Sequence, residues 1–191
     1  MNRRPWEEEG SPWKTESAFL SWVRGVLRRG WSKHPIKLEF IKKYRKQVPN
    51  PNPKGKKPTI WGMTCDCCKK DFPLQVPRQL KGVVPTIEID HIEDASSLKS
   101  SEDLGGFAYR LFYVTFDLLR PLCKPCHDIY TYMAKHNVSY EEAKGTKEVI
   151  KKMNSLSVKE QKDELKAAGF LEKEVSNADK RRECYKKILI K

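Results

Sequence analysis

The chain has 191 residues, enough for one moderate core or for a small core with helical extensions at both ends. Lysine and arginine total 38 against 25 aspartates and glutamates, a formal net charge of +13. Such a surface favours nucleic acid over an acidic protein as partner. Because no apolar run could span a bilayer and the N-terminus lacks the apolar stretch of a signal peptide, we expect a cytoplasmic protein with no membrane partner.

The N-terminal region contains two predicted basic helices. The first runs from about Glu16 to Arg29, with Thr15 as its N-cap and Gly30 at its end. Its apolar residues fall on one face and its arginines largely on the other. A second helix begins near Pro35 and is rich in lysine. The predicted apolar face of the first helix comprises Phe19, Val23, Val26 and Leu27.

A proline-rich segment follows the second helix over residues 48–58. It has too many prolines for a helix or a central strand, so it is predicted to be an extended linker. A domain boundary is placed here. The expected organisation is a basic helical arm with its linker over 1–58, a core over 59–137 and a helical region over 138–191.

Two cysteine pairs predict a metal site. Cys65 and Cys68 form one C-x-x-C pair, and Cys123 and Cys126 form another. Four thiolates from two such turns can close a tetrahedral structural zinc site, and a reducing cytoplasm argues against disulfides. Buried thiols without a metal explain this paired spacing poorly. Cys67 could replace a ligand of the first pair, but the two-residue spacing favours the outer cysteines.

The segment between the cysteine pairs predicts a β-β-α unit. An alternating run over 83–89 predicts a strand with Asp90 and His91 at its end. An insertion over about 96–115 contains a short helix with a flexible glycine pair, residues 105–106, before it. A second strand over 118–122 leads to the second cysteine pair, and His127 lies in the first turn of the next helix. The inward residues predicted for the short helix are Phe107, Leu111 and Phe112.

At these positions the chain resembles a known family. Ile89-Asp90-His91-Ile92, followed by Leu122-Cys123-Lys124-Pro125-Cys126-His127-Asp128, is similar to the HNH endonucleases, in particular the zinc-knuckle members found in bacteriophage genomes. The resemblance covers roughly residues 65–131. It implies an α+β fold with a ββα-metal core and a four-cysteine zinc knuckle site, flanked by N- and C-terminal helices.

The resemblance also implies catalytic roles. His91 would be the general base that activates water for attack on the scissile phosphorus. Asp90 and His127 would hold a catalytic divalent cation, Mg²⁺ or Mn²⁺ with Ni²⁺ or Zn²⁺ as alternatives. The products would be a 5′-phosphate and a 3′-hydroxyl. In a different arrangement, His127 could complete the zinc site in place of a cysteine.

One position departs from the family pattern. The family has an asparagine five residues before the first cysteine of the second pair, where its side chain braces the loop of the catalytic histidine; Leu118 stands there in this chain. Asp117 is the neighbouring candidate for that role, if the strand shifts or bulges. Loss of the brace would weaken or abolish catalysis.

The C-terminal third predicts helices and little function. Capping-box patterns begin at Ser139 and Ser157, and Gly169 ends the second helix. A third helix starts near Ser176, with Cys184 as a core residue. Its basic residues could bind phosphates or form a solvated face. These residues are Lys180, Arg181, Arg182, Lys186 and Lys187.

Taken together, the sequence predicts a metal-dependent HNH DNA endonuclease, a phosphodiester hydrolase that nicks or cuts DNA. Its partners would be DNA and, by the resemblance, a phage terminase or another phage protein. The alternative is a non-catalytic zinc module that binds nucleic acid or a phage complex. His34 and His136 are predicted to be surface or capping residues. The residues predicted to bind DNA phosphates are Arg24, Arg28, Lys42, Lys43 and Arg120.

Overall fold

The computed structural model describes residues 4–52, 54, 57–93 and 98–190. It divides into two compact units, Met1–Cys126 and His127–Lys191, whereas the sequence predicts boundaries near residues 58 and 137. The fold is mixed α+β, with small sheets confined to the first unit. Within the described ranges, no helix combines the length and the apolar character needed to cross a membrane.

Helix α1 (Glu16–Ser32) begins where the sequence predicts and ends later. The Thr15 hydroxyl oxygen accepts a hydrogen bond from the Ala18 amide at 3.2 Å, which confirms the predicted N-cap. The predicted end at Gly30 is wrong. A Cβ at this position would lie 3.3 Å from the Phe112 ring, so the glycine lets another helix approach closely.

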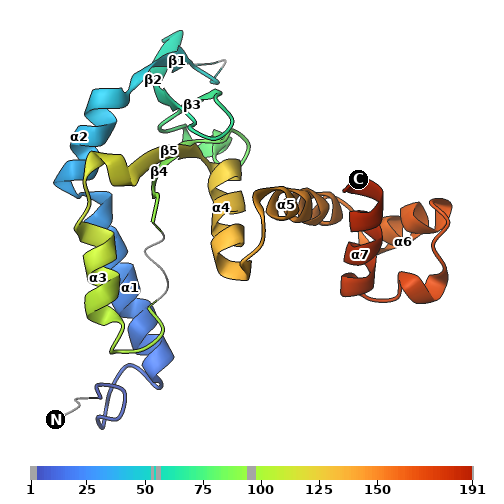
Figure 1. Ribbon diagram of the computed structural model, residues 1–191, viewed down its shortest axis with the longest axis horizontal. Helices are drawn as coiled ribbons and strands as arrows, with labels where there is room; N and C mark the ends of the chain where they lie inside the picture. The colour runs from blue at the N-terminus through green and yellow to red at the C-terminus, as the bar shows by residue number, and fades with distance from the viewer. Residues whose placement is uncertain (1–3, 53, 55–56, 94–97, 191) are drawn as a thin grey trace. The chain divides into compact units, whose positions relative to one another are not determined.

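That other helix is α3 (Leu104–Phe112), which lies beside α1 (Figure 1). Phe107 and Leu111 are buried, as predicted, but the glycines expected as a flexible lead are inside the helix. On α1 the buried residues are Leu20 and Trp31, while Val26 is exposed. The apolar face predicted for α1 is therefore rotated from the face that packs.

Helix α2 (Pro35–Tyr44) begins with proline, as predicted, and leads into a three-stranded antiparallel sheet. The strands are β1 (Lys46–Pro49), β2 (Thr59–Thr64) and β3 (Asp71–Pro73), in the order β1-β2-β3. The predicted linker over 48–58 thus begins as a strand. Val48 is buried, and Pro49 is tolerated because β1 is an edge strand.

The second sheet carries the Asp-His pair. β4 (Ile87–His91) pairs antiparallel with β5 (Leu119–Cys123), so that Asp90 lies opposite Arg120. Strand β4 begins at Ile87, four residues after the predicted start at Val83, and Val83 is largely exposed. Short 3-10 turns precede each strand, at Arg78–Leu80 and Phe116–Leu118.

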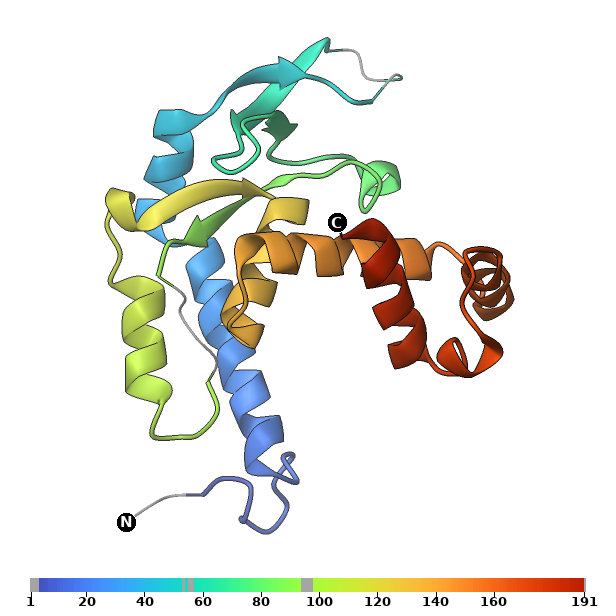
Figure 2. The same cartoon turned by 45° about the vertical axis from the view of Figure 1, so that its right-hand side comes forward.

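Helix α4 (Lys124–His136) follows β5 directly, and the chain continues in the second unit as three further α-helices. α5 (Tyr140–Asn154) and α6 (Val158–Ala167) have Ser139 and Ser157 as N-caps, as predicted. A 3-10 turn, Glu172–Glu174, leads to α7 (Ala178–Leu189). The three helices gather around one core (Figure 2). Its buried residues are Val149, Leu165, Val175, Cys184 and Tyr185.

Candidate functional site

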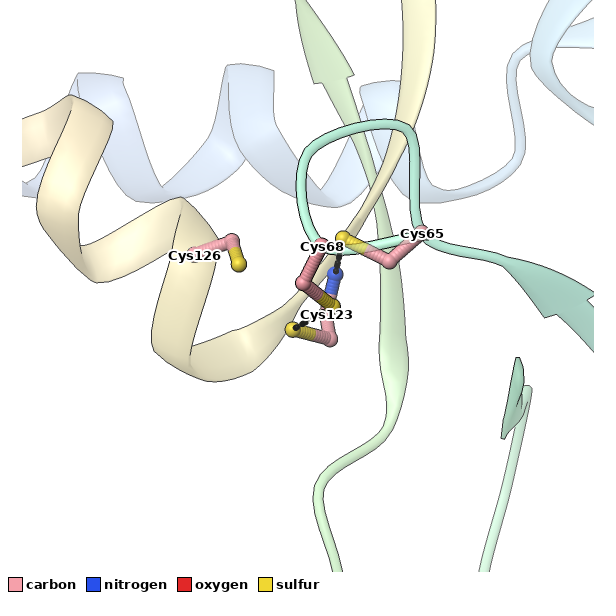
Figure 3. A group of neighbouring side chains, drawn as sticks. All are labelled: Cys65, Cys68, Cys123 and Cys126. Carbon is pink, nitrogen blue, oxygen red and sulfur yellow. Dashed lines mark hydrogen bonds between the residues drawn. The ribbon is translucent and has the colours of Figure 1, made fainter. Parts of the chain in front are cut away.

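The two cysteine pairs meet in the first unit. The sulfur atoms of Cys65, Cys68, Cys123 and Cys126 all lie within 4.8 Å of one another. Figure 3 shows that the first pair comes from the turn between β2 and β3, and that the second pair spans the end of β5 and the first turn of α4. The group therefore joins both sheets and a helix, and it consists of the outer cysteines that the spacing favours.

Backbone hydrogen bonds shape the turn that holds the first pair. The Cys65 amide donates to the Lys70 carbonyl at 2.8 Å, and the Lys69 amide donates to the Cys65 carbonyl at 2.9 Å. Lys69 adopts a left-handed conformation with φ of 59°, which reverses the chain after Cys68. The Cys123 amide donates to the Cys65 sulfur at 3.3 Å, linking the two pairs.

The sulfur geometry and chemistry fit a divalent metal such as zinc. Zn–S bonds of about 2.3 Å place tetrahedral sulfur atoms about 3.8 Å apart, and the Cys68 and Cys123 sulfurs are 3.9 Å apart. Burial raises the pKa of the Cys65 thiol, but backbone hydrogen bonds, the largest from Cys123, outweigh it and lower the pKa to about 7.

The pKa values of two other thiols in this group are shifted in the opposite direction. Burial raises the pKa of Cys123 to about 11 and raises that of Cys126 further. Sulfurs this close repel one another as thiolates, and a bound cation would remove that repulsion. The donor set is therefore suited to hold a structural metal.

Asp90, the predicted ligand of a catalytic cation, is held by a cross-strand ion pair. Nε and Nη2 of Arg120 donate to Asp90 Oδ2 at 3.0 and 2.9 Å. Both side chains are only 18% exposed, so the pair is shielded from solvent. Arg120, predicted to bind DNA phosphates, thus serves first to orient the carboxylate.

His91 has one ring nitrogen engaged by the backbone. Its Nε2 lies 3.2 Å from the carbonyl oxygen of Leu111, at the end of α3. Because a carbonyl only accepts, Nε2 carries the proton, and the lone pair of the neutral ring is on Nδ1. Burial lowers the pKa of His91 below its usual value, which favours this neutral form.

The hydrogen bonding between β4 and β5 continues one residue past His91, at the position where the resemblance expects an asparagine. The carbonyl of Leu118 accepts a hydrogen bond of 2.9 Å from the amide of Ile92, the residue after His91. Asp117 is exposed, and hydrogen bonds from the Thr115 side chain and its own backbone lower its pKa. Its role as a brace for His91 stays a prediction.

One aromatic ring of the N-terminal helices, that of Trp31, packs against His91. The Trp31 ring centroid is 4.3 Å from that of His91 and 5.3 Å from that of His34. Lys37 Nζ lies 5.2 Å from the Trp31 centroid, within cation–π range. His34 is half-buried at the N-cap position of α2, as predicted for a capping residue, but its side chain makes no cap hydrogen bond and its Nδ1 is buried with no hydrogen-bond partner among the described residues.

A small cavity of about 150 Å³ borders His91. Sequence patterns did not indicate it, because its walls come from segments far apart in the chain. Tyr109 and Tyr113 are largely exposed and line this cavity; the sequence shows only that two tyrosines stand four residues apart. The cavity is lined by His91, Glu93, Tyr109, Arg110, Tyr113, Val114 and Leu118.

The remaining predicted site residues lie apart from this cluster or in the other unit. Arg24 and Arg28 are on α1, and Lys42 and Lys43 are on α2; all but Arg24 are well exposed. His127 is in the first turn of α4, as predicted, but belongs to the second unit, so its joint site with Asp90 stays a prediction. Comparison with protein-family models, curated proteins and solved structures finds no match.

Proposed function

We propose that the chain is a metal-dependent HNH-type endonuclease that hydrolyses phosphodiester bonds in DNA. The observation that carries the proposal is the environment of His91. It stands at the end of β4 beside the ion-paired Asp90, with Nε2 at the Leu111 carbonyl and its ring bordering a cavity. A neutral, oriented imidazole beside a carboxylate is the arrangement that general-base hydrolysis needs.

In the proposed reaction, Nδ1 of His91 takes a proton from water as the water oxygen attacks the scissile phosphorus. The P–O bond to the 3′ oxygen breaks and the departing oxygen takes up a proton from solvent, which leaves a 5′-phosphate and a 3′-hydroxyl. A divalent cation held by Asp90 and His127 would neutralise charge on the phosphate and the departing oxygen. Arg120 orients Asp90, and the Leu118 carbonyl steadies the backbone that follows His91.

The cysteine group supports the proposal as scaffold. It joins the turn after β2 to β5 and to the start of α4, so it sets the pairing of the strand that carries Arg120 opposite Asp90. The net charge of +13 and the exposed lysines of α2 supply affinity for phosphates without reading sequence.

A supercoiled-plasmid assay tests the proposal. Wild-type protein with Mg²⁺ or Mn²⁺ should nick or linearise the plasmid, and EDTA should stop it. His91→Ala should lose at least about a hundredfold in rate, as expected when a general base is removed. His136→Ala is the matched control, because His136 stacks on Tyr132 in the second unit and should leave the rate unchanged.

Two observations favour a second candidate, a non-catalytic metal-stabilised module that binds nucleic acid. Arg120 already neutralises the Asp90 carboxylate, and Leu118 stands where an asparagine is expected. If plasmid binds tightly, with full metal content in the cysteine site, yet no metal ion supports cleavage, the binding module replaces the nuclease.

A further inference from the structure

Two tyrosines, one in helix α3 and one at its C-cap, are exposed to solvent next to the candidate base. Tyr109 and Tyr113 are 60% and 72% exposed, and their rings stack with centroids 4.7 Å apart and planes 18° from parallel. Tyr109 lies in the last turn of α3 and Tyr113 is the C-cap residue that follows it, so the two rings meet at the end of the helix. Both also line the cavity that borders His91. Exposed aromatic rings beside His91 suggest a ligand with a flat ring that can stack on them.

The cavity has the size and walls for one such ring. Its volume of about 150 Å³ is below that of ordinary small-molecule pockets. Val114 is buried and Leu118 is half-buried, and both add apolar surface to the lining that contains the two tyrosines. The leucine that departs from the family pattern thus contributes to a surface that an asparagine would make polar.

The polar edges of the cavity distinguish a nucleobase from a phosphate. Arg110 can donate hydrogen bonds to ring nitrogens and carbonyl oxygens, and Glu93 can accept them from exocyclic amino groups. A phosphate could also pair with Arg110, but it would meet the Glu93 carboxylate and two apolar side chains, which disfavour it relative to a neutral ring. The phosphate therefore belongs outside the cavity, on the side of His91 and Asp90.

The geometry points to a base-binding subsite in which one unpaired nucleobase, next to the scissile phosphate, stacks on Tyr109 and Tyr113. This inference rests on the proposed function and names its substrate class. A base within a duplex has both faces covered by its neighbours, and taking it out of the stack costs a few kcal/mol. The preferred substrate is therefore single-stranded or locally unpaired DNA.

A binding experiment in buffer without added Mg²⁺ or Mn²⁺, which leaves the metal of the cysteine site in place, tests the subsite without cleavage. The full chain is titrated with a fluorescein-labelled single strand of mixed sequence and with its matched duplex. The variant Tyr109→Leu/Tyr113→Leu should lose about tenfold or more in affinity for the single strand, the scale of base–aromatic stacking. Its duplex affinity should stay unchanged. Tyr109→Phe/Tyr113→Phe keeps both rings and should bind both DNAs like the wild type.

A second measurement places the base by its fluorescence. A single strand containing 2-aminopurine should be quenched on binding to wild type and to the phenylalanine variant, and not on binding to the leucine variant. Unchanged tryptophan-monitored unfolding shows that the leucine variant is folded. Equal loss on single strand and duplex, or no loss on either, overturns the subsite.

The outcomes separate the subsite from the nuclease. If wild-type protein cleaves DNA while the leucine variant binds and cleaves single strands normally, the nuclease stands and the subsite is wrong. If tyrosine-dependent single-strand binding is found but no metal supports cleavage, the subsite stands as a binding site and the proposed hydrolysis is wrong.

Discussion

In the second unit, three helices close over one apolar core, whereas the first unit distributes its buried residues over two small sheets and a pair of helices. The first unit adds a group of four cysteines and a series of ring contacts around Trp31. Small sheets alone bury little apolar surface. The first unit should therefore depend on its metal, and the second on packing.

Spectroscopy can follow the two units separately. All five tryptophans fall at or before residue 61, so tryptophan fluorescence reports on the first unit alone. The helical circular dichroism signal includes the second unit. If fluorescence and circular dichroism show different unfolding transitions, the stabilities of the first and second units can be measured separately.

The largest expected effect is loss of the metal. Cys123→Ser should unfold the first unit, because structural zinc contributes roughly 10–16 kcal/mol of binding free energy in small domains. Tryptophan emission should shift to the red while helical signal from the second unit remains. Cys67→Ser is the control, since Cys67 is outside the four-sulfur group, and should keep both metal and fold. Loss of metal with unchanged emission would contradict the comparison.

A substitution that creates a cavity in the core of the second unit should affect the circular dichroism transition and leave tryptophan fluorescence unchanged. Leu165→Ala removes a fully buried side chain from the core and should cost about 2–5 kcal/mol in the free energy of unfolding. The circular dichroism transition in urea should move to lower concentration, and the tryptophan transition should not. Val158→Ala, at an exposed position of the same helix, should change neither. A shift of both transitions by Leu165→Ala would show that the units unfold together.

Breaking a buried polar network in the second unit should lower the free energy of unfolding by less than the loss of Leu165 does. Arg181 is 6% exposed and donates to the side chain of Gln161 at 2.9 Å and to the Val175 carbonyl at 3.2 Å. Arg181→Leu should cost about 1–3 kcal/mol, because the Gln161 acceptor is left buried without its donor. Lys180→Met, at an exposed position of the same helix, should be nearly neutral in the same urea experiment. An unaffected Arg181→Leu transition would contradict the role of the network.

The smallest effect concerns Lys37. Burial lowers the pKa of this lysine, so its charge is less favourable in the folded than in the unfolded chain. Lys37→Met should raise stability by less than about 1 kcal/mol, discounted for partial exposure. Because the pKa of Lys37 is lowered in the folded state, the extra stability of Lys37→Met over the wild type is greatest at neutral pH. It disappears as the pH rises through the normal lysine pKa, where the lysine is neutral in both the folded and the unfolded chain. Thermal unfolding followed by fluorescence at pH 7 and pH 11 measures it, and a gain that grows with pH would contradict it.

The sequence by itself determined the features that depend on short-range chemistry. N-caps at Thr15, Ser139 and Ser157 satisfy amides within three residues, so the pattern predicts them directly. The same holds for the cysteine pairs, whose spacing matches the bite of one metal. The pairing of the two strands around Asp90 and His91 follows from their alternation and from the segment that returns the chain.

Only the tertiary structure decided what depends on distant partners. Gly30 resembles a helix end but meets the Phe112 ring, and Arg181 resembles a solvated charge but is bonded inside a core. Trp31 and Tyr113 reach the surroundings of His91 because α1 and α3 pack together. Local periodicity predicts which side chains can be buried. Which neighbour buries them depends on contacts between residues far apart in the sequence, which form only when the chain folds.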